Sequence, residues 1–382
     1  MIYLDYNRTT PVAVGVLDAM KPFWTSHFLL PSQEHACGKA VSEAIEDARE
    51  KVAGLMGCEP FEVVFTAGGT EADNLAILGH CRSDRHAGVR SKKSAAAPHA
   101  LISSLESDGV YEIANQLRRQ GWEIDEVPCD GDGWVDPDAV AGRMNSRTRW
   151  VAVQMASPIL GTIQSVAEIA AICRQRGVHC HCDATQSWGK IPIHAASLGT
   201  DTVSLSAHKI FGPKGVGALY VRRGFDLAPI QYGEPREMGL RPGSENVTGC
   251  VGMGAAAEMA ARVADEAEAG LRELSNDFLN GVISSIEPAP ELLGEAAARL
   301  PNTLALRMPG DANRIQQATR QLVMATPQSL DPPDEMTRTL RAIGLPPAQI
   351  GRIIRFSIGS ATTRDELSRA VELLADGWES VR

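Results

Sequence analysis

Apolar and polar residues recur at two different spacings along this chain, and the spacing predicts its elements. Short apolar runs bounded by turn residues predict strands at 62–66, 100–105, 150–155, 178–182, 203–206, 302–307 and 353–357. Apolar residues repeated every three or four positions predict helices at 42–55, 71–80, 110–119, 166–176, 252–285, 315–322 and 364–378. Ser165 and Glu168 have the spacing of a capping box before one of these helices. The alternation of strands and helices is typical of an α/β protein.

Composition limits the class of protein. A chain of 382 residues can form a large domain and a smaller one. The net charge of −10 argues against nucleic-acid binding. The N-terminus shows no secretory signal, and no apolar run reaches the roughly 20 residues of a membrane span. We therefore predict a cytoplasmic protein that binds neither membrane nor nucleic acid. Residues 82–98 are polar and alanine-rich, which predicts an exposed loop.

The eight cysteines are irregularly spaced, which predicts buried thiols, Cys37 among them. His179, Cys180, His181 and Cys182 are adjacent, as in some metal sites. On a strand, however, consecutive side chains point to opposite faces and cannot converge on one ion. We therefore predict no metal site.

Two polar clusters follow predicted strands. Asp183 ends the strand at 178–182, and Lys209 follows the strand at 203–206. Ligands of open α/β sheets bind beyond the carboxyl ends of the strands, so both clusters are expected to face one crevice. A carboxylate can pair with a pyridinium nitrogen and a lysine can form a Schiff base, the combination that pyridoxal 5′-phosphate (PLP) chemistry needs.

Each of these assignments has an alternative. Asp183 could cap the turn after its strand. Lys190 and Lys214 are the other nearby lysines. We expect Lys190 on the solvent side of a turn and Lys214 in a loop, which leaves Lys209 as the Schiff-base candidate.

A glycine turn precedes the helix predicted at 71–80. Gly69 and Thr70 lie in this turn, where backbone N–H groups can approach an anion at a helix N-terminus. Ser206 and His208, at the end of another strand, add polar groups. We predict a phosphate site formed by these four residues. Alternatively, Thr70 only caps the helix.

Several motifs together resemble a known family. The first motif comprises residues 3–6 and 9–11, and the second comprises residues 65–74. The blocks around Asp183 and Lys209 follow, and the last two motifs are residues 241–246 and 354–359. In this order they resemble the class V aminotransferases and, within them, the cysteine desulfurases of the NifS/IscS type. The resemblance spans nearly the whole chain.

The resemblance implies an α/β fold, that of PLP-dependent transferases of fold type I. A large domain at 15–255 would hold a mostly parallel seven-stranded sheet, and residues 1–14 with 256–382 would form a smaller α+β domain. The large domain would bind PLP. The protein would be a homodimer, with Ser244 touching the phosphate in the other subunit's site.

The resemblance also assigns roles at the site. Lys209 would carry PLP and shuttle a proton at the substrate α-carbon, while Asp183 and Gln186 would hold the ring. Arg355 would bind the substrate carboxylate in a bidentate pair. Asn246, like Ser244, could instead cap the following helix.

Three positions depart from the family pattern. Ser107 stands near the place of a stacking histidine, and Ser157-Pro158 replaces an asparagine that bonds the ring hydroxyl. Glu106 or Asp108 could move protons instead. The loop at 325–333 lacks the nucleophilic cysteine, since Ser329 is nearest to that position and Cys250 is the last cysteine in the chain.

These departures leave several functions open. The first is a PLP enzyme that removes the α-proton of a small amino acid and eliminates a β-substituent, as a C–S lyase, with transamination as the next choice. Alternatives are a weakened homologue that serves as a scaffold, and a desulfurase that uses a partner's thiol, a free thiol or Cys37. A sulfur-acceptor protein is a possible partner of the last.

Overall fold

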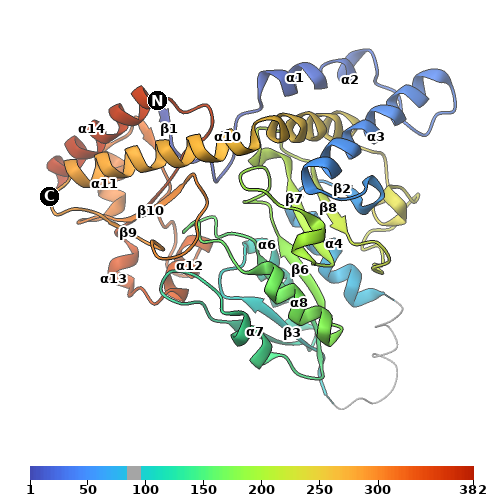
Figure 1. The fold of residues 1–382 in the computed structure, drawn as a ribbon, viewed down its shortest axis with the longest axis horizontal. Helices are drawn as coiled ribbons and strands as arrows, with labels where there is room; N and C mark the ends of the chain where they lie inside the picture. Colours follow the sequence, from blue (N-terminus) through green and yellow to red (C-terminus); the bar gives the residue numbers. More distant parts are fainter. Residues whose placement is uncertain (84–95) are drawn as a thin grey trace.

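The computed structural model describes residues 1–83 and 96–382, apart from the side chains of 264–267. Most of the loop predicted at 82–98 therefore lies outside the described residues. The chain has a seven-stranded sheet, a three-stranded sheet and a two-stranded sheet, with helices packed around them (Figure 1). The predicted α/β class, with a mostly parallel central sheet, is confirmed.

The seven-stranded sheet carries the polar clusters at its strand ends. Its order is β2-β8-β7-β6-β5-β3-β4. The strands are β2 (Val63–Thr66), β3 (His99–Ser103), β4 (Glu123–Val127), β5 (Thr148–Gln154), β6 (His179–Asp183), β7 (Thr202–Ser206) and β8 (Gly217–Val221). The pairs from β4 to β7 are parallel, and β8 runs antiparallel to both of its neighbours. The carboxyl ends of β5, β6 and β7 therefore meet at one edge.

Helices cover both faces of this sheet because strands buried on both sides need two apolar layers. The helices packed about the sheet are α3 (Ala36–Met56), α4 (Gly69–Arg82), α6 (Asp108–Arg119), α7 (Pro137–Arg143) and α8 (Val166–Arg176). Helix α4 contacts β6, β7 and β8 and packs on α6. Helix α3 packs on α10 (Val247–Ser285), which is the longest helix drawn in Figure 1.

The remaining strands lie around the other end of α10. The order β12-β10-β9 forms an antiparallel sheet, and β1 pairs with β11 in parallel. These strands are β1 (Ile2–Tyr3), β9 (Glu291–Leu292), β10 (Thr303–Arg307), β11 (Leu322–Val323) and β12 (Ile353–Ser357). Helices α11 (Ala312–Ala318), α12 (Glu335–Ala342), α13 (Pro347–Ile350) and α14 (Arg364–Val381) pack beside them. The N-terminal strand thus joins the C-terminal part of the chain.

Two separate apolar clusters accompany the two ends of α10. One lies beneath the large sheet and includes Trp188 and Met253. The other joins Ile2 and Leu4 to Phe278, Phe356 and further side chains of the C-terminal region. No described helix is long and apolar enough to cross a membrane. The domain boundary near residue 255 falls inside α10 and stays a prediction.

Local expectations failed where tertiary contacts compete with local ones. Ser165 makes no capping bond to α8, because its hydroxyl accepts the indole N–H of Trp134 (3.3 Å). The helix predicted at 315–322 ends at Ala318, since the next segment leaves to pair β11 with β1. Helices α1 (Val14–Met20), α2 (Pro22–Thr25), α7 and α12 were not predicted. Their short length gives a weak periodic signal.

Candidate functional site

Asp183 and Lys209 line the same cavity at the carboxyl edge of the large sheet. Asp183 is the last residue of β6, and Lys209 ends a single helical turn (Ala207–Lys209) directly after β7. Because β6 and β7 are parallel neighbours, their ends bring the two side chains together. The crevice expected from the sequence is present.

The carboxylate of Asp183 has two different oxygens. Oδ1 accepts hydrogen bonds from Thr185 N (2.9 Å) and Thr185 Oγ1 (2.6 Å). One carboxylate oxygen, Oδ1, therefore caps the turn after the strand, as the alternative predicted. Oδ2 receives no hydrogen bond from the described residues and remains for a ligand.

The amine of Lys209 is bonded to backbone carbonyls near the N-terminus. Its Nζ donates to the carbonyl oxygens of Asn7 and, at 3.2 Å, of Arg8. Burial, together with the positive charge of Arg355, lowers the pKa of Lys209 to about 8. The amine is therefore partly neutral near physiological pH, the state in which a lysine acts as a nucleophile.

The predicted phosphate residues form one cavity of about 440 Å³ with Lys214. Gly69, Thr70, Ser206 and His208 all line it. Gly68 is the N-cap of α4 and contributes no side chain, so the capping alternative for Thr70 is wrong. The first turn of a helix has N–H groups without intrahelical partners, which favour an anion here.

His208 faces this cavity as a neutral imidazole. Burial, together with the charges of Lys209, Lys214 and Lys190, lowers the pKa of His208 to about 4. Its Nδ1 lies 3.1 Å from the hydroxyl of Thr9, so Nε2 remains for another partner. The positive charge of the cavity lining therefore comes from Arg8 and Lys214.

The cavity residues fit PLP. A Cβ at Gly69 would lie 2.5 Å from Thr185 Cγ2, and one at Gly217 would lie 2.7 Å from the backbone of Gly68, so both glycines are required by close approach. Asp183 Oδ2 is left for a ring nitrogen and Lys209 for a carbonyl carbon. The donors suit a phosphate. PLP would be held by Asp183, Lys209 and the phosphate cavity.

We expect loss of either hydroxyl to weaken PLP binding. Thr70→Val and Ser206→Ala each remove one hydrogen bond to a charged group, worth about 1.5–3 kcal/mol, which corresponds to roughly 10- to 100-fold in Kd. Titration of the apoprotein with PLP, followed by tryptophan fluorescence, measures this change. Ser146→Ala, at an exposed position before β5, is the control. Unchanged affinity in both variants would contradict the phosphate assignment.

Arg355 is buried on β12 at the other side of the Lys209 cavity. Its guanidinium pairs with Asp5 and donates to the carbonyl oxygen of Pro158 (3.2 Å). Its Nε is buried without a hydrogen-bond partner among the described residues. Because the residue lines the cavity, its guanidinium is placed to bind a carboxylate ligand.

Lys190 is not on the solvent side of a turn, as predicted. Its Nζ donates to Asn7 Oδ1 (3.1 Å) and lies 2.7 Å from the amide oxygen of Gln186, with the amide oriented to accept. Burial, with the charges of Lys209 and Arg355, lowers its pKa well below the usual range. The turn after Gln186 folds back under the N-terminal segment, which carries Lys190 inward.

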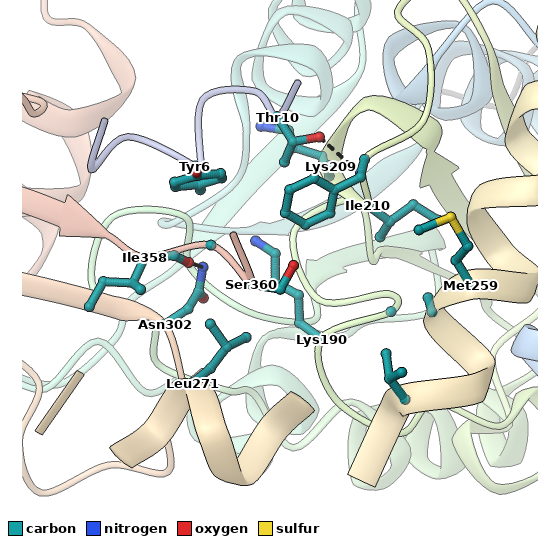
Figure 2. Close-up of a pocket in the computed structure, with 15 residues that line it drawn as sticks. Tyr6, Thr10, Lys190, Lys209, Ile210, Met259, Leu271, Asn302, Ile358 and Ser360 are labelled. Carbon is teal, nitrogen blue, oxygen red and sulfur yellow. Dashed lines mark hydrogen bonds between the residues drawn. The ribbon is translucent and has the colours of Figure 1, made fainter. Parts of the chain in front are cut away.

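A second cavity lies on the other side of Lys209, next to α10. Lys190 and Lys209 line it together with Tyr6 and Asn302 (Figure 2). The other lining side chains are mostly apolar, among them Met259 and Leu271. Lys209 therefore lines both this apolar cavity and the polar cavity of Asp183, whereas Lys190 lines the apolar cavity.

Of the residues near the position of the family's stacking histidine, only Ser107 lies at the Asp183 cavity. Ser107 lines the Asp183 cavity, as its position suggested. Glu106 is buried away from it and accepts from Ser103 Oγ (2.5 Å) and Gln154 N (2.8 Å), and burial raises its pKa to about 8. Asp108 pairs with Arg338 at 2.7 Å. Neither acid lines this cavity, which disfavours both as proton carriers.

Ser157 does not replace the ring-hydroxyl asparagine. It is fully buried, and its Oγ accepts from the backbone N–H groups of Ile159 (3.3 Å) and Leu160 (3.2 Å). Ala156 and Pro158 line the cavity in its stead. A serine at a tight turn satisfies its own backbone first.

Cys37 and the two histidines of β6 lie outside the cavities that contain Lys209. Cys37 is exposed at the start of α3, so its predicted burial is wrong, and it lines none of the described cavities that contain Lys209. His181 Nε2 lies 3.1 Å from Asp73 Oδ1, and His179 Nε2 lies 2.8 Å from Thr202 Oγ1.

None of residues 241–246 lines these cavities, although Arg241 pairs at 3.3 Å with Glu71 of the phosphate cavity. Ser244 is exposed and lines none of the described cavities. Asn246 caps α10 by accepting from Gly249 N (3.1 Å), as the alternative expected. The role of Ser244 in a partner's site stays a prediction.

Several residues that line the cavities were missed by sequence reasoning, among them Asn7, Arg8, Lys214 and Glu335. Asn7 and Arg8 lie inside the N-terminal motif, whose position among the family blocks was the available signal. Glu335 follows a proline-rich loop and begins a short helix, where periodicity carries little information.

Comparisons with known proteins agree with this geometry. The family described as aminotransferase class-V matches residues 2–314. A cysteine desulfurase IscS from Dictyoglomus turgidum is 35% identical over all of this chain and 95% of its own length. Cysteine desulfurase IscS 1 from Archaeoglobus fulgidus is also 35% identical, over all of this chain and 98% of its own.

Solved structures give the same result. A NifS-like protein superposes with a TM-score of 0.90 at 28% identity, covering 100% of both chains. SspA in complex with cysteine superposes with a TM-score of 0.78 at 28% identity, covering 94% of this chain and 99% of its own. The cofactor of this family is PLP, which the cavity residues fit. The chain therefore belongs to the aminotransferase class-V family and is similar to its cysteine desulfurases of the IscS and NifS type.

Proposed function

We propose that this protein is a PLP-dependent C–S lyase that eliminates the β-substituent of a small sulfur-containing amino acid without an enzyme cysteine. The observation that carries the proposal is the makeup of the Asp183 cavity. Its described lining contains one lysine, two arginines and two carboxyl groups, and no thiol. Elimination needs a base and a carboxylate anchor, whereas desulfurisation needs a sulfur nucleophile.

The loop at the nucleophile position supports the same proposal. Ser329 stands there, and its Oγ donates to the carbonyl oxygen of Pro332 (2.6 Å). A serine hydroxyl cannot accept sulfur to form a persulfide. Asp334 further ties this loop to α12 by accepting from Gln328 N (2.7 Å) and Thr337 N (2.8 Å). These bonds hold the segment in place.

In the proposed mechanism, Arg355 binds the substrate carboxylate from the wall of the cavity. PLP, when bound, supplies an electron sink for the substrate α-carbon. Asp183 holds a proton at the ring nitrogen. Lys209 would accept the α-proton at Nζ. The Cβ–S bond then breaks with its electron pair on sulfur, and water completes the conversion to a thiol, pyruvate and ammonia.

Relatives support the substrate class. SspA was solved in complex with cysteine, and the IscS relatives are named cysteine desulfurases. A cysteine derivative with its sulfur already substituted keeps the same amino and carboxylate groups. We propose such S-substituted cysteines, including cystine, as substrates. A homodimer is proposed on the family resemblance and is checked by light scattering of the purified protein.

The product of S-ethylcysteine distinguishes the candidate functions. We expect equal amounts of pyruvate, ammonia and ethanethiol, without alanine, from protein purified with PLP and assayed with S-ethylcysteine. Cysteine is assayed in parallel with a reductant. Alanine and sulfide from cysteine, without pyruvate, would contradict the lyase and favour a desulfurase that uses another thiol. Bound PLP without turnover of either compound would favour a scaffold.

A further inference from the structure

Glu335 contributes a carboxyl group to the wall of the substrate cavity. It is the first residue of α12, and Asp334 caps this helix by accepting from Thr337 N (2.8 Å). Glu335 lines the same cavity as Lys209 and Arg355. The loop and helix together therefore present this side chain to the site at which Lys209 would act.

The carboxyl group of Glu335 has no hydrogen bond or ion pair among the described residues. The neighbouring acid Asp108 is satisfied differently, by its ion pair with Arg338 (2.7 Å). Glu335 shares the cavity with Lys209 and Arg355, and the charges of Asp108 and Arg338 also act on it. Burial exceeds the attraction of these cations and raises the pKa of Glu335. A cavity carboxyl that holds its proton to higher pH is suited to donate it.

Asp183 and Lys209, which could also transfer protons in this cavity, already have proposed roles. The described lining carries two carboxyl groups, of Asp183 and Glu335, and no histidine, cysteine or tyrosine. Asp183 is bonded to Thr185 through Oδ1 and faces the proposed ring nitrogen with Oδ2. Lys209 receives the α-proton. A substrate bound through its carboxylate to Arg355 therefore has Glu335 as the remaining acid for its side chain.

We propose that Glu335 is the general acid that protonates the departing sulfur. The inference rests on the proposed C–S lyase function and names the group that assists the leaving thiol. As the Cβ–S bond breaks, its electron pair goes to sulfur, which takes the proton of the Glu335 carboxyl. Glu335 becomes a carboxylate between Lys209, which has gained the α-proton, and Arg355. Proton transfer from Lys209 or from water restores the acid.

Two substrates with different leaving groups test this assignment. Ethanethiolate leaves S-ethylcysteine with help from an acid, whereas chloride leaves β-chloroalanine without a proton. We expect Glu335→Gln to lower kcat/KM for S-ethylcysteine by about 10²- to 10⁴-fold. The loss for β-chloroalanine should be at least about tenfold smaller. Glu112→Gln, which removes an exposed carboxylate of α6 outside the cavity, should change neither rate appreciably.

A second measurement uses the apoprotein. Because its folded pKa is raised, Glu335 favours the folded state when protonated, and this contribution is lost as the pH rises through the folded pKa. Glutamine resembles the protonated acid at every pH. The unfolding midpoint of Glu335→Gln should therefore exceed that of the wild type at pH 8, and the difference should vanish toward pH 4.

Different failures have different meanings. Equal losses with both substrates, or an unfolding difference that does not depend on pH, would overturn the role of Glu335 while leaving the lyase intact. A wild type that binds PLP and eliminates from neither substrate would overturn the proposed function, and this inference with it.

Discussion

Replacing Lys209 with alanine should abolish the long-wavelength absorbance of covalently bound PLP and reduce turnover by at least about 10⁴-fold. The variant loses the amine that carries the cofactor and the base for the α-proton, and a general base alone contributes roughly 10²- to 10⁴-fold. Spectra of wild type and variant with added PLP, followed by the S-ethylcysteine assay, measure both effects.

The other two nearby lysines are the controls for this result. Lys214 lines the phosphate cavity, and Lys190 is bonded to Asn7. Lys214→Ala and Lys190→Met should both keep the absorbance band at saturating PLP. If the band persisted in Lys209→Ala and disappeared in one of the controls, the lysine replaced in that control would carry the cofactor, and the assignment to Lys209 would be wrong.

The capture of PLP by Lys209 should depend on pH. The pKa of Lys209 is lowered to about 8, and only the neutral amine attacks a carbonyl carbon. The rate of band formation should rise as the pH increases through about 8 and level off above it. A rate that keeps rising toward pH 10.5 would indicate an unperturbed lysine.

Replacing Arg355 with methionine should raise KM for the substrate and lower kcat/KM by roughly 30- to 4,000-fold. The range follows from the 2–5 kcal/mol cost of removing one partner of a buried, hydrogen-bonded charge pair. Methionine keeps an unbranched apolar side chain in the core. Steady-state kinetics with S-ethylcysteine, and with its decarboxylated analogue, measure the effect, because the analogue lacks the carboxylate that Arg355 would bind.

Asp5 provides the matched control for Arg355. Asp5→Asn removes the ion pair seen between these residues and keeps the guanidinium in place. We expect kcat/KM of Asp5→Asn to stay within about tenfold of wild type, since a ligand carboxylate can replace the lost partner. A loss as large as that of Arg355→Met would mean that the ion pair, and not carboxylate binding, explains the effect.

Much of the central sheet was predictable because buried strands carry continuous apolar runs. The apolar run at 150–155 and the alternating Val-Ser-Leu-Ser at 203–206 correspond to β5 and β7 within two residues. Strand β4 has three exposed residues of five and was missed, since a strand at the sheet edge lacks such a run. Strand β8 was missed as well, although four of its five residues are buried.

The site was predictable where its residues end neighbouring strands. Asp183, Ser206 and Lys209 follow β6 and β7, and parallel neighbours place their carboxyl ends together. Lys190 and Glu335 lie outside this rule. One follows a turn that folds inward beneath Asn7, and the other begins α12 in the C-terminal part of the chain.

The sequence by itself determined the α/β class, the family and the chemistry of PLP, because each depends on residue types at fixed spacings along the chain. The tertiary structure decided which distant segments complete the cavity. Lys209 is bonded to the carbonyl oxygen of Asn7, 202 residues away, and Glu335 joins the same cavity from α12. Periodicity records which face of an element is buried, whereas contact between these segments depends on how the sheets and α10 pack in space.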